Sequence, residues 1–105
     1  MYYPVSSLLI EFLILSVVEQ KDSYGYALSQ TVKLAANIKE SALYPVLRKL
    51  EQHGYLSTYN QEMQGRNRKY YSITAEGKHQ LLYLRQEWET YKETIDGIIE
   101  GRLKP

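Results

Sequence analysis

The sequence contains no cysteine, and its aromatic residues are eleven tyrosines with only one tryptophan and one phenylalanine. The lack of cysteine excludes disulfides, thiolate nucleophiles and cysteine-ligated metals, and it fits a reducing compartment, so we expect a cytoplasmic protein. A long hydrophobic run is also missing. The apolar stretch Leu8–Val18 contains Glu11, follows no basic segment and is too short to span a bilayer. We therefore expect a buried helix there, and neither a signal peptide nor a membrane partner.

Groups of side chains that carry out catalysis or bind metals are missing as well. His53 and His79 are neither spaced nor accompanied as metal ligands or acid–base partners are. Glu87 and Glu89 would face different sides of a helix, so they cannot form a catalytic pair. No nucleophile–base pair and no phosphate-binding loop is recognisable. We therefore expect a protein that is not an enzyme, with no catalytic residues, no metal and no cofactor.

The charges are distributed unevenly along a chain of 105 residues, which has room for one domain with one hydrophobic core. Residues 39–79 contain seven basic and four acidic side chains, although the net charge of the whole chain is only +1. A basic segment of this kind is where a polyanion such as nucleic acid would bind. The signal is weak by itself, because many neutral proteins show a similar imbalance.

Hydrophobic spacing and capping residues predict two helices in the first third of the chain. Pro4 and the serines at positions 6 and 7 are suited to begin the first, which continues over Leu8–Val18. That stretch is apolar nearly all round, so its helix must be covered on more than one side. Asp22 and Ser23 are suitable N-cap residues for a second helix over Tyr24–Ala36.

A third helix is predicted between two residues typical of helix ends. Asn37 and Glu40 have the spacing of a capping box, and Gly54 is a typical residue just after a helix. Pro45 lies inside this helix, where it costs least if it falls in the first two turns. The inward-facing residues have helical spacing: Leu43, Val46, Leu47 and Leu50.

The pattern then changes to short segments rich in tyrosine, threonine and isoleucine. Tyr55–Tyr59 and Lys69–Thr74 are predicted to be two antiparallel strands. The polar segment Asn60–Arg68, which contains Gly65, is too long for a two-residue turn and is predicted to be an exposed loop. Three helices followed by a hairpin with a basic loop is the order of elements in a winged helix-turn-helix, which we assign to residues 1–74.

The remainder of the chain, residues 75–105, is predicted to form one long helix that begins after Thr74. The spacing of its apolar residues is that of a heptad seam, and a second copy of the chain is the simplest cover for it. The expected fold is therefore mainly α with a small β-hairpin: a winged helix-turn-helix plus one long C-terminal dimerisation helix. The predicted dimer interface consists of Leu81, Leu84, Trp88, Tyr91, Ile95 and Ile98.

Several of these segments closely resemble the PadR family of transcriptional regulators. The segments are ALYPVLRKLE at 42–51 with GYL at 54–56, GRNRKYYSITAEG at 65–77, and YGY at 24–26. The single C-terminal helix resembles the short PadR subfamily, in which that helix forms the dimer interface. The resemblance implies a DNA-binding regulator, and we expect a homodimeric repressor that binds an inverted repeat. The sequence departs from the family at Lys39–Ala42, where Ser-Glu-Gly-Thr is common, so the operator cannot be inferred.

The basic residues of the third helix and of the hairpin are the predicted contacts with double-stranded DNA. A helix in this position enters the major groove, and a basic hairpin can follow the backbone into a minor groove. The alternatives are a solvated helix face and an ordinary soluble loop. The fold would also suit a protein-interaction module that does not bind DNA, but such a module does not need so many cations in its hairpin. The predicted contacts are Lys39, Tyr44, Arg48, Lys49, Arg66, Arg68 and Lys69.

Trp88 is the only tryptophan in the chain, and it lies on the predicted seam. Its simplest role is to pack between the two helices of a dimer. In multidrug-responsive members of the PadR family, a tryptophan of this helix stacks on flat aromatic ligands at the dimer centre, and Trp88 aligns with it. The resemblance therefore makes a small planar aromatic molecule a candidate ligand of Trp88.

Overall fold

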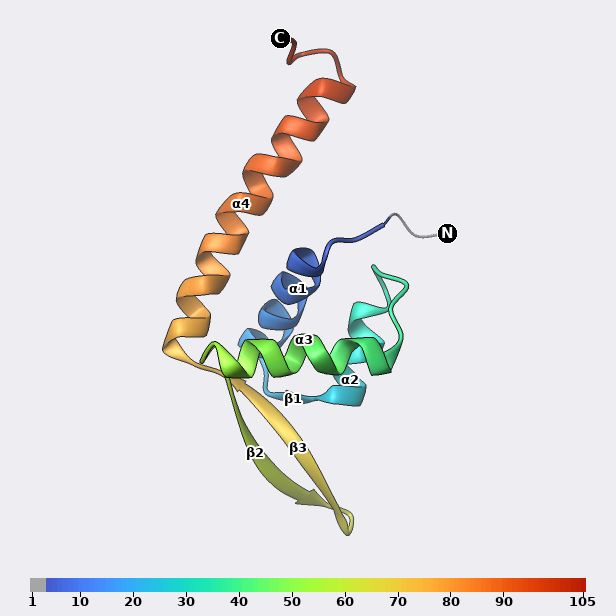
Figure 1. Ribbon diagram of the computed structural model, residues 1–105, viewed down its shortest axis with the longest axis vertical. Helices are drawn as coiled ribbons and strands as arrows, with labels where there is room; N and C mark the ends of the chain where they lie inside the picture. The colour runs from blue at the N-terminus through green and yellow to red at the C-terminus, as the bar shows by residue number, and fades with distance from the viewer. Residues whose placement is uncertain (1–3) are drawn as a thin grey trace.

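The computed structural model describes residues 4–105, in which three helices, an antiparallel hairpin and a long fourth helix follow one another (Figure 1). This order of elements is the predicted winged helix-turn-helix with a C-terminal helix. A two-residue strand precedes the second helix and completes a sheet with the order β1-β3-β2. The elements are α1 (Ser7–Gln20), β1 (Ser23–Tyr24), α2 (Gly25–Val32), α3 (Glu40–Gln52), β2 (Leu56–Met63), β3 (Arg66–Ile73) and α4 (Ala75–Ile99).

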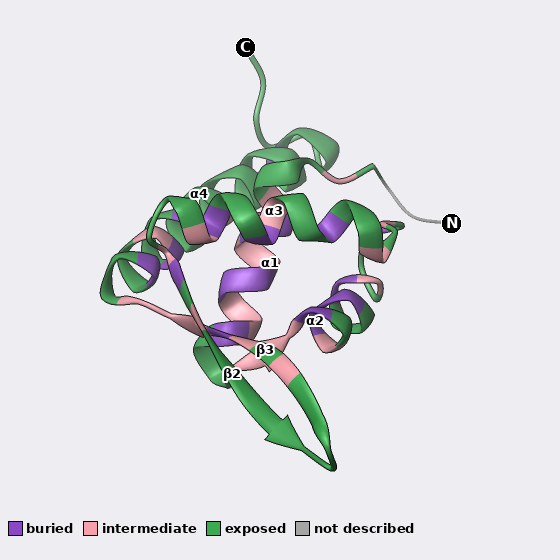
Figure 2. Ribbon diagram, turned by 60° about the horizontal axis from the view of Figure 1, so that its bottom comes forward, coloured by how far each residue is buried: buried purple, intermediate pink, exposed green. Residues whose placement is uncertain are grey.

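Helix α1 lies at the centre of the molecule, as its apolar sequence predicts. It packs against α2, α3, β3 and α4, and the side chains of Ile14 and Leu15 are fully buried (Figure 2). Full burial of one such side chain contributes about 1.5–3 kcal/mol to folding. The core also includes Leu81 and Leu84 of α4, so the first turns of this helix pack within the chain itself.

Capping side chains fix several helix ends where the sequence predicts them. The hydroxyl of Ser6 accepts a hydrogen bond from the Leu9 amide at 3.2 Å, and the hydroxyl of Thr74 accepts one from the Gly77 amide at 2.9 Å. Gly54 follows α3 with a φ of 76°. Its amide and the next one donate to carbonyls of the last turn of α3, which is the Schellman arrangement that favours glycine.

The starts of α2 and α3 differ from the prediction. Ser23 does not cap α2, because residues 23 and 24 form β1 and pair with Tyr71 and Tyr70 of β3. Helix α2 is also shorter than predicted and ends at Val32. Asn37 does not begin α3; the N-cap is Lys39, whose side chain makes no capping hydrogen bond. In the segment before it the Ile38 amide donates to the Ala36 carbonyl, and Ile38 packs against the hydrophobic core.

The prediction of a long exposed loop over Asn60–Arg68 is wrong. Strands β2 and β3 are paired over their full length, out to Met63 opposite Arg66, so only Gln64 and Gly65 form the turn. Both residues have positive φ, 54° and 76°, as a two-residue type I′ hairpin turn requires. The sequence hides these strands because the outer hairpin is solvent-exposed on both faces, and an alternating hydrophobic pattern is therefore absent.

Candidate nucleic-acid interface

Helix α3 presents a polar face to solvent on the side opposite its buried leucines. The fully buried residues Leu43 and Leu47 fix the rotation of the helix, and this rotation places Tyr44 and Arg48 on the exposed side. Among residues 4–105, Arg48 has no ion-pair partner. An unpaired guanidinium in the middle of an exposed helix face can donate to guanine edges or to phosphates.

Tyr44 is held in place by two neighbouring elements. Its hydroxyl donates to the Glu40 carboxylate at 3.0 Å, and its ring lies against Gly25 at the start of α2. A Cβ atom at position 25 would come within 2.7 Å of the tyrosine ring, so glycine allows the two helices to approach here. Burial, together with the hydrogen bond to Glu40, raises the pKa of Tyr44 above its usual value. The hydroxyl therefore stays protonated and can act as a donor.

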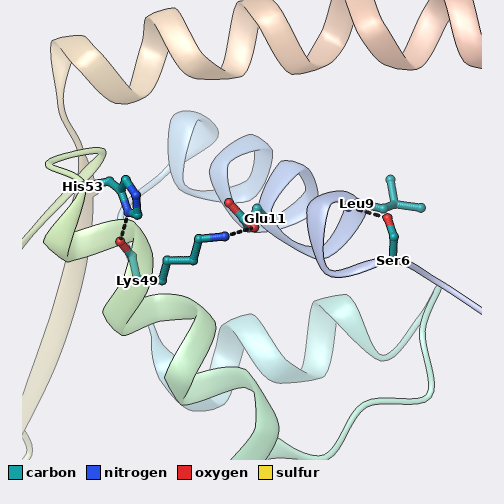
Figure 3. A network of polar contacts seen from close by, with 5 residues as sticks. All are labelled: Ser6, Leu9, Glu11, Lys49 and His53. Carbon is teal, nitrogen blue, oxygen red and sulfur yellow. Dashed lines mark hydrogen bonds and ion pairs between the residues drawn. The ribbon is translucent and has the colours of Figure 1, made fainter.

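Lys49 is paired within the chain. Its ammonium group reaches across to α1 and binds the Glu11 carboxylate at 3.0 Å (Figure 3). In the same region, the ring of His53 makes a hydrogen bond with the carbonyl of Lys49 at 2.8 Å. The sequence did not reveal the ion pair, because its two members are 38 residues apart. Lys39 is exposed at the N-cap of α3.

The three cations of the hairpin lie on β3 and have different surroundings. The guanidinium of Arg68 lies 4.4 Å from the centre of the Tyr24 ring, in the geometry of a cation–π contact. Lys69 binds the Glu51 carboxylate at 3.4 Å. This ion pair joins the β2–β3 hairpin, which is the wing of the fold, to α3, which occupies the position of the recognition helix. Arg66 lies next to the turn and is exposed, and it has no ion-pair partner among the described residues.

Tyrosines of the three adjacent strands pack into a ladder in which Tyr70 is stacked on Tyr59 and meets Tyr24 edge-on. The Tyr70 ring lies between Tyr59, at 5.6 Å, and Tyr24, at 5.4 Å. The hydroxyl of Tyr59 donates to the Asp22 carboxylate at 2.7 Å, and this hydrogen bond raises the pKa of Tyr59. The sequence does not reveal this ladder, because β1 has only two residues and the register of the hairpin follows from no local pattern.

A cleft of about 500 Å³ lies between α3 and the wing. It brings together four of the seven predicted DNA contacts, and no acidic side chain lines it. Burial raises the pKa of Tyr71, and the nearby positive charges of Lys69 and Arg48 counter this rise. The lining residues are Tyr24, Gly25, Tyr26, Tyr44, Arg66, Arg68, Lys69 and Tyr71.

A second groove, of about 470 Å³, lies between α1 and α4 and includes Trp88. Trp88 is half-buried and lies 6.4 Å from the Tyr91 ring, measured between centroids. Residues on the α1 side of the groove include Leu8, Leu9 and Phe12. Toward the C-terminus, α4 extends beyond the rest of the molecule and its apolar residues become exposed (Figure 1).

The predicted dimer seam is divided between two environments. Leu81 and Leu84 are only 1% and 3% exposed in the single chain, so α1 covers them and they leave no surface for a second chain. Further along α4, Tyr91 and Ile98 are 62% and 60% exposed. The first two seam positions therefore belong to the intramolecular core, which corrects the prediction that they face a partner.

Two further absences hold for residues 4–105. They contain no group of three histidine, aspartate or glutamate side chains that could hold a metal ion. None of their helices is both long enough and apolar enough to cross a membrane.

The three-helix head, the wing and the basic cleft define a winged helix-turn-helix protein of the kind that regulates transcription. Residues 14–82 match the PadR-like family of transcriptional regulators. The chain belongs to this family, whose members are transcription regulators and not enzymes.

The chain is also similar to proteins of known structure or sequence, one of which is named as a PadR family regulator. A protein of Streptococcus mutans UA159 is 65% identical and has a TM-score of 0.96, with 100% of this chain and 99% of that one covered. A PadR family regulator of Clostridium difficile R20291 is 33% identical, with a TM-score of 0.80 over 86% of this chain and 97% of the other. An uncharacterized protein of Lysinibacillus sphaericus is 39% identical over 97 residues, which are 88% of this chain and 89% of its own.

Proposed function

We propose that this protein is a homodimeric repressor that binds an inverted-repeat operator through α3 and the wing. The cleft between Tyr44 of α3 and the cations of β3 supports the proposal, because Tyr44 and three cations of β3 line it together. Repression is the simplest consequence of such binding, since a protein that occupies an operator excludes polymerase. The family assignment supports the DNA-binding activity.

The geometry suggests how the contacts are divided. We expect Arg48, which is exposed on α3 and has no ion-pair partner among the described residues, to donate to base edges in the major groove. Tyr44 has one hydroxyl proton, so we expect it to donate to a phosphate only by giving up its hydrogen bond to Glu40. We expect Arg66 and Arg68 on β3, which line the cleft, to contact the DNA backbone. Lys39 adds a positive charge at the N-cap of α3, and Lys69, which is paired with Glu51, lines the cleft.

We assign the dimer interface to the projecting part of α4. Its exposed apolar residues would form a solvent-facing stripe in a monomer, and a stripe of that kind marks an interaction site. A second copy of α4 can cover this stripe with the same residues, which is how two-fold interfaces are built. The interface residues that remain from the predicted seam are Trp88, Tyr91, Ile95 and Ile98.

The operator is tested by selecting bound sequences from a random duplex pool. A two-fold dimer with two identical heads should enrich an inverted repeat, with half-sites about one helical turn (roughly 34–36 Å) apart or a multiple of this spacing. Enrichment of a sequence without two-fold symmetry would contradict the dimer. No enrichment at all would favour the alternative of a winged-helix module that binds protein.

A second proposed activity is the release of DNA by a planar aromatic ligand at Trp88. The groove beside Trp88 supports this, because it is lined mainly by apolar side chains of α1 and α4 and opens at the proposed dimer interface. An aromatic ring at an open apolar groove suits stacking with a flat ligand. The ligand would weaken DNA binding only if it stabilises a dimer geometry that the operator does not accept.

A further inference from the structure

The buried carboxylate of Glu11 has no place in the DNA contacts described above. It lies within the apolar helix α1, and its side chain is only 7% exposed. A buried charge is costly unless it is paired and hydrogen-bonded. Among the described residues, its ion-pair partner is Lys49, whose own side chain is 54% exposed. The carboxylate is therefore fixed by the core, and the lysine comes to it from the surface of α3.

The pair connects the element at the centre of the fold to the recognition helix. Helix α1 packs against both α3 and α4, whereas α3 and α4 are not extensively packed against each other. The Glu11–Lys49 bond joins α1 to α3, and Lys49 directly follows Arg48 in α3, about 100° further round the helix. Holding Lys49 therefore also holds the backbone that carries Arg48.

We infer that Glu11 is a positioning residue for DNA recognition: it fixes α3 through Lys49 and withholds this lysine from the DNA phosphates. The inference rests on the proposed DNA binding. A free lysine beside Arg48 would bind any phosphate equally well and so raise affinity for all sequences. Pairing with Glu11 removes that contribution, so that a larger share of the binding free energy depends on base contacts.

The dependence of DNA affinity on salt tests this directly, because each phosphate contact adds about 0.9 to the slope of log K against log salt concentration. Replacing Glu11→Gln frees Lys49, so the slope on random duplex should steepen by about one. The ratio of operator to random affinity should fall by roughly 2- to 30-fold, the range for residues that modulate a coupled site without touching the ligand. Glu89→Gln is the matched control, since it removes the same charge from the exposed Glu89–Lys92 pair on α4.

A second variant keeps the test valid if Glu11→Gln unfolds. The double change Glu11→Met with Lys49→Met replaces the whole pair by apolar side chains, which proteins often tolerate. Because Lys49 makes no phosphate contact in the native protein, this variant should retain the native salt slope while its operator preference falls. Circular dichroism confirms that each variant is folded before binding is measured.

Two results would overturn the inference while the proposed function stands. If the double variant loses about one unit of slope, Lys49 contacts phosphate in the native protein. If Glu11→Gln behaves like Glu89→Gln in both slope and preference, Glu11 does not position α3. Failure of the native protein to prefer any duplex would instead refute the proposed function itself, and the inference with it.

Discussion

Arg48 and Arg66 are both exposed arginines without an ion-pair partner in the described part of the chain, but their elements give them different access to DNA. Arg48 lies on the outer face of α3, where a helix in a major groove meets base edges. Arg66 lies beside the hairpin turn, where a strand meets the sugar-phosphate backbone. At the scale of single residues, sequence preference and general affinity should therefore be separable.

Substitution of each arginine by alanine tests this separation. Arg48→Ala should reduce the preference for operator over random duplex by about 1–3 kcal/mol, the worth of a good base contact. Arg66→Ala should weaken binding to both duplexes about equally and reduce the salt slope by about one unit. Titrations of both duplexes at several salt concentrations measure the two effects. If the two variants show the same pattern, the division of roles is wrong.

At the scale of elements, the two-residue turn of the wing has one suboptimal residue. Gln64 adopts a φ of 54°, which favours asparagine or glycine, whereas Gly65 already suits its own φ of 76°. We expect Gln64→Asn to stabilise the protein by up to about 1 kcal/mol, because a type I′ turn prefers Asn-Gly. Thermal unfolding followed by circular dichroism measures the gain.

Gln61→Asn is the matched control for the turn, because Gln61 lies within β2 opposite Arg68. Asparagine is disfavoured in strands, so this change should lower the melting temperature or leave it unchanged. Equal gains at positions 61 and 64 would show that the turn conformation is not responsible.

The sequence predicts those elements that have a strong local pattern. The stripe of leucines in α3, Gly54 after it and Thr74 before α4 are local signals, and they correctly predict the end of α3 and the start of α4. The strand β1 has only two residues and therefore no period to recognise. The outer hairpin is exposed on both faces, so its sequence looks like a loop. Local patterns therefore reveal the helices but not the sheet register that places the cations.

The heptad seam and the Glu11–Lys49 ion pair depend on contacts that local sequence patterns do not distinguish. A helix that packs on its own chain and a helix that packs on a second copy need the same apolar spacing, so the sequence could not assign Leu84 to the core and Tyr91 to the surface. The bond between Glu11 and Lys49 joins two helices whose relative placement follows only from the complete fold.

At the scale of the whole molecule, the exposed end of α4 should determine the oligomeric state. Tyr91→Glu together with Ile98→Glu places two charges on the proposed interface without touching the core, because both side chains are exposed in the single chain. We expect a folded monomer in sedimentation experiments, since charges buried without partners disfavour association. The monomer should also bind the inverted repeat more weakly.

Leu82→Glu serves as the control for the interface. Leu82 is also an exposed apolar residue of α4, but at about 100° of rotation per residue it lies on the opposite side of the helix from Tyr91 and Ile98. This variant should remain a dimer. A Tyr91, Ile98 double variant that also remains a dimer would place the interface elsewhere.

Helix α1 contacts both proposed sites, the groove beside Trp88 and the recognition helix α3. One of its sides lines the groove with Trp88, and another holds Lys49 of the recognition helix. A ligand that displaces Phe12 or the neighbouring leucines would therefore act on the same helix that positions α3. This arrangement gives ligand binding a direct structural route to the DNA surface, provided that the ligand favours one dimer geometry over another.

We expect planar, apolar and preferably cationic dyes to quench the fluorescence of Trp88 at concentrations below about 1 mM. Stacking and cation–π attraction contribute about 0.5–2 kcal/mol for each ring, and burial of the dye in the groove adds more. Because Trp88 is the only tryptophan, its emission reports on this site alone. The same dyes should lower the affinity for the operator, measured in parallel by titration.

Trp88→Leu distinguishes stacking on the ring from binding elsewhere in the molecule. Leucine preserves the apolar surface between α1 and α4 but removes the flat ring on which a dye can stack, so calorimetry should show a loss of about tenfold or more in dye affinity if stacking contributes 1.4 kcal/mol or more. Operator binding without the dye should remain close to native, because Trp88 does not line the cleft between α3 and the hairpin and leucine keeps the proposed dimer interface apolar. Unchanged dye affinity in Trp88→Leu would leave Trp88 with a packing role in the dimer.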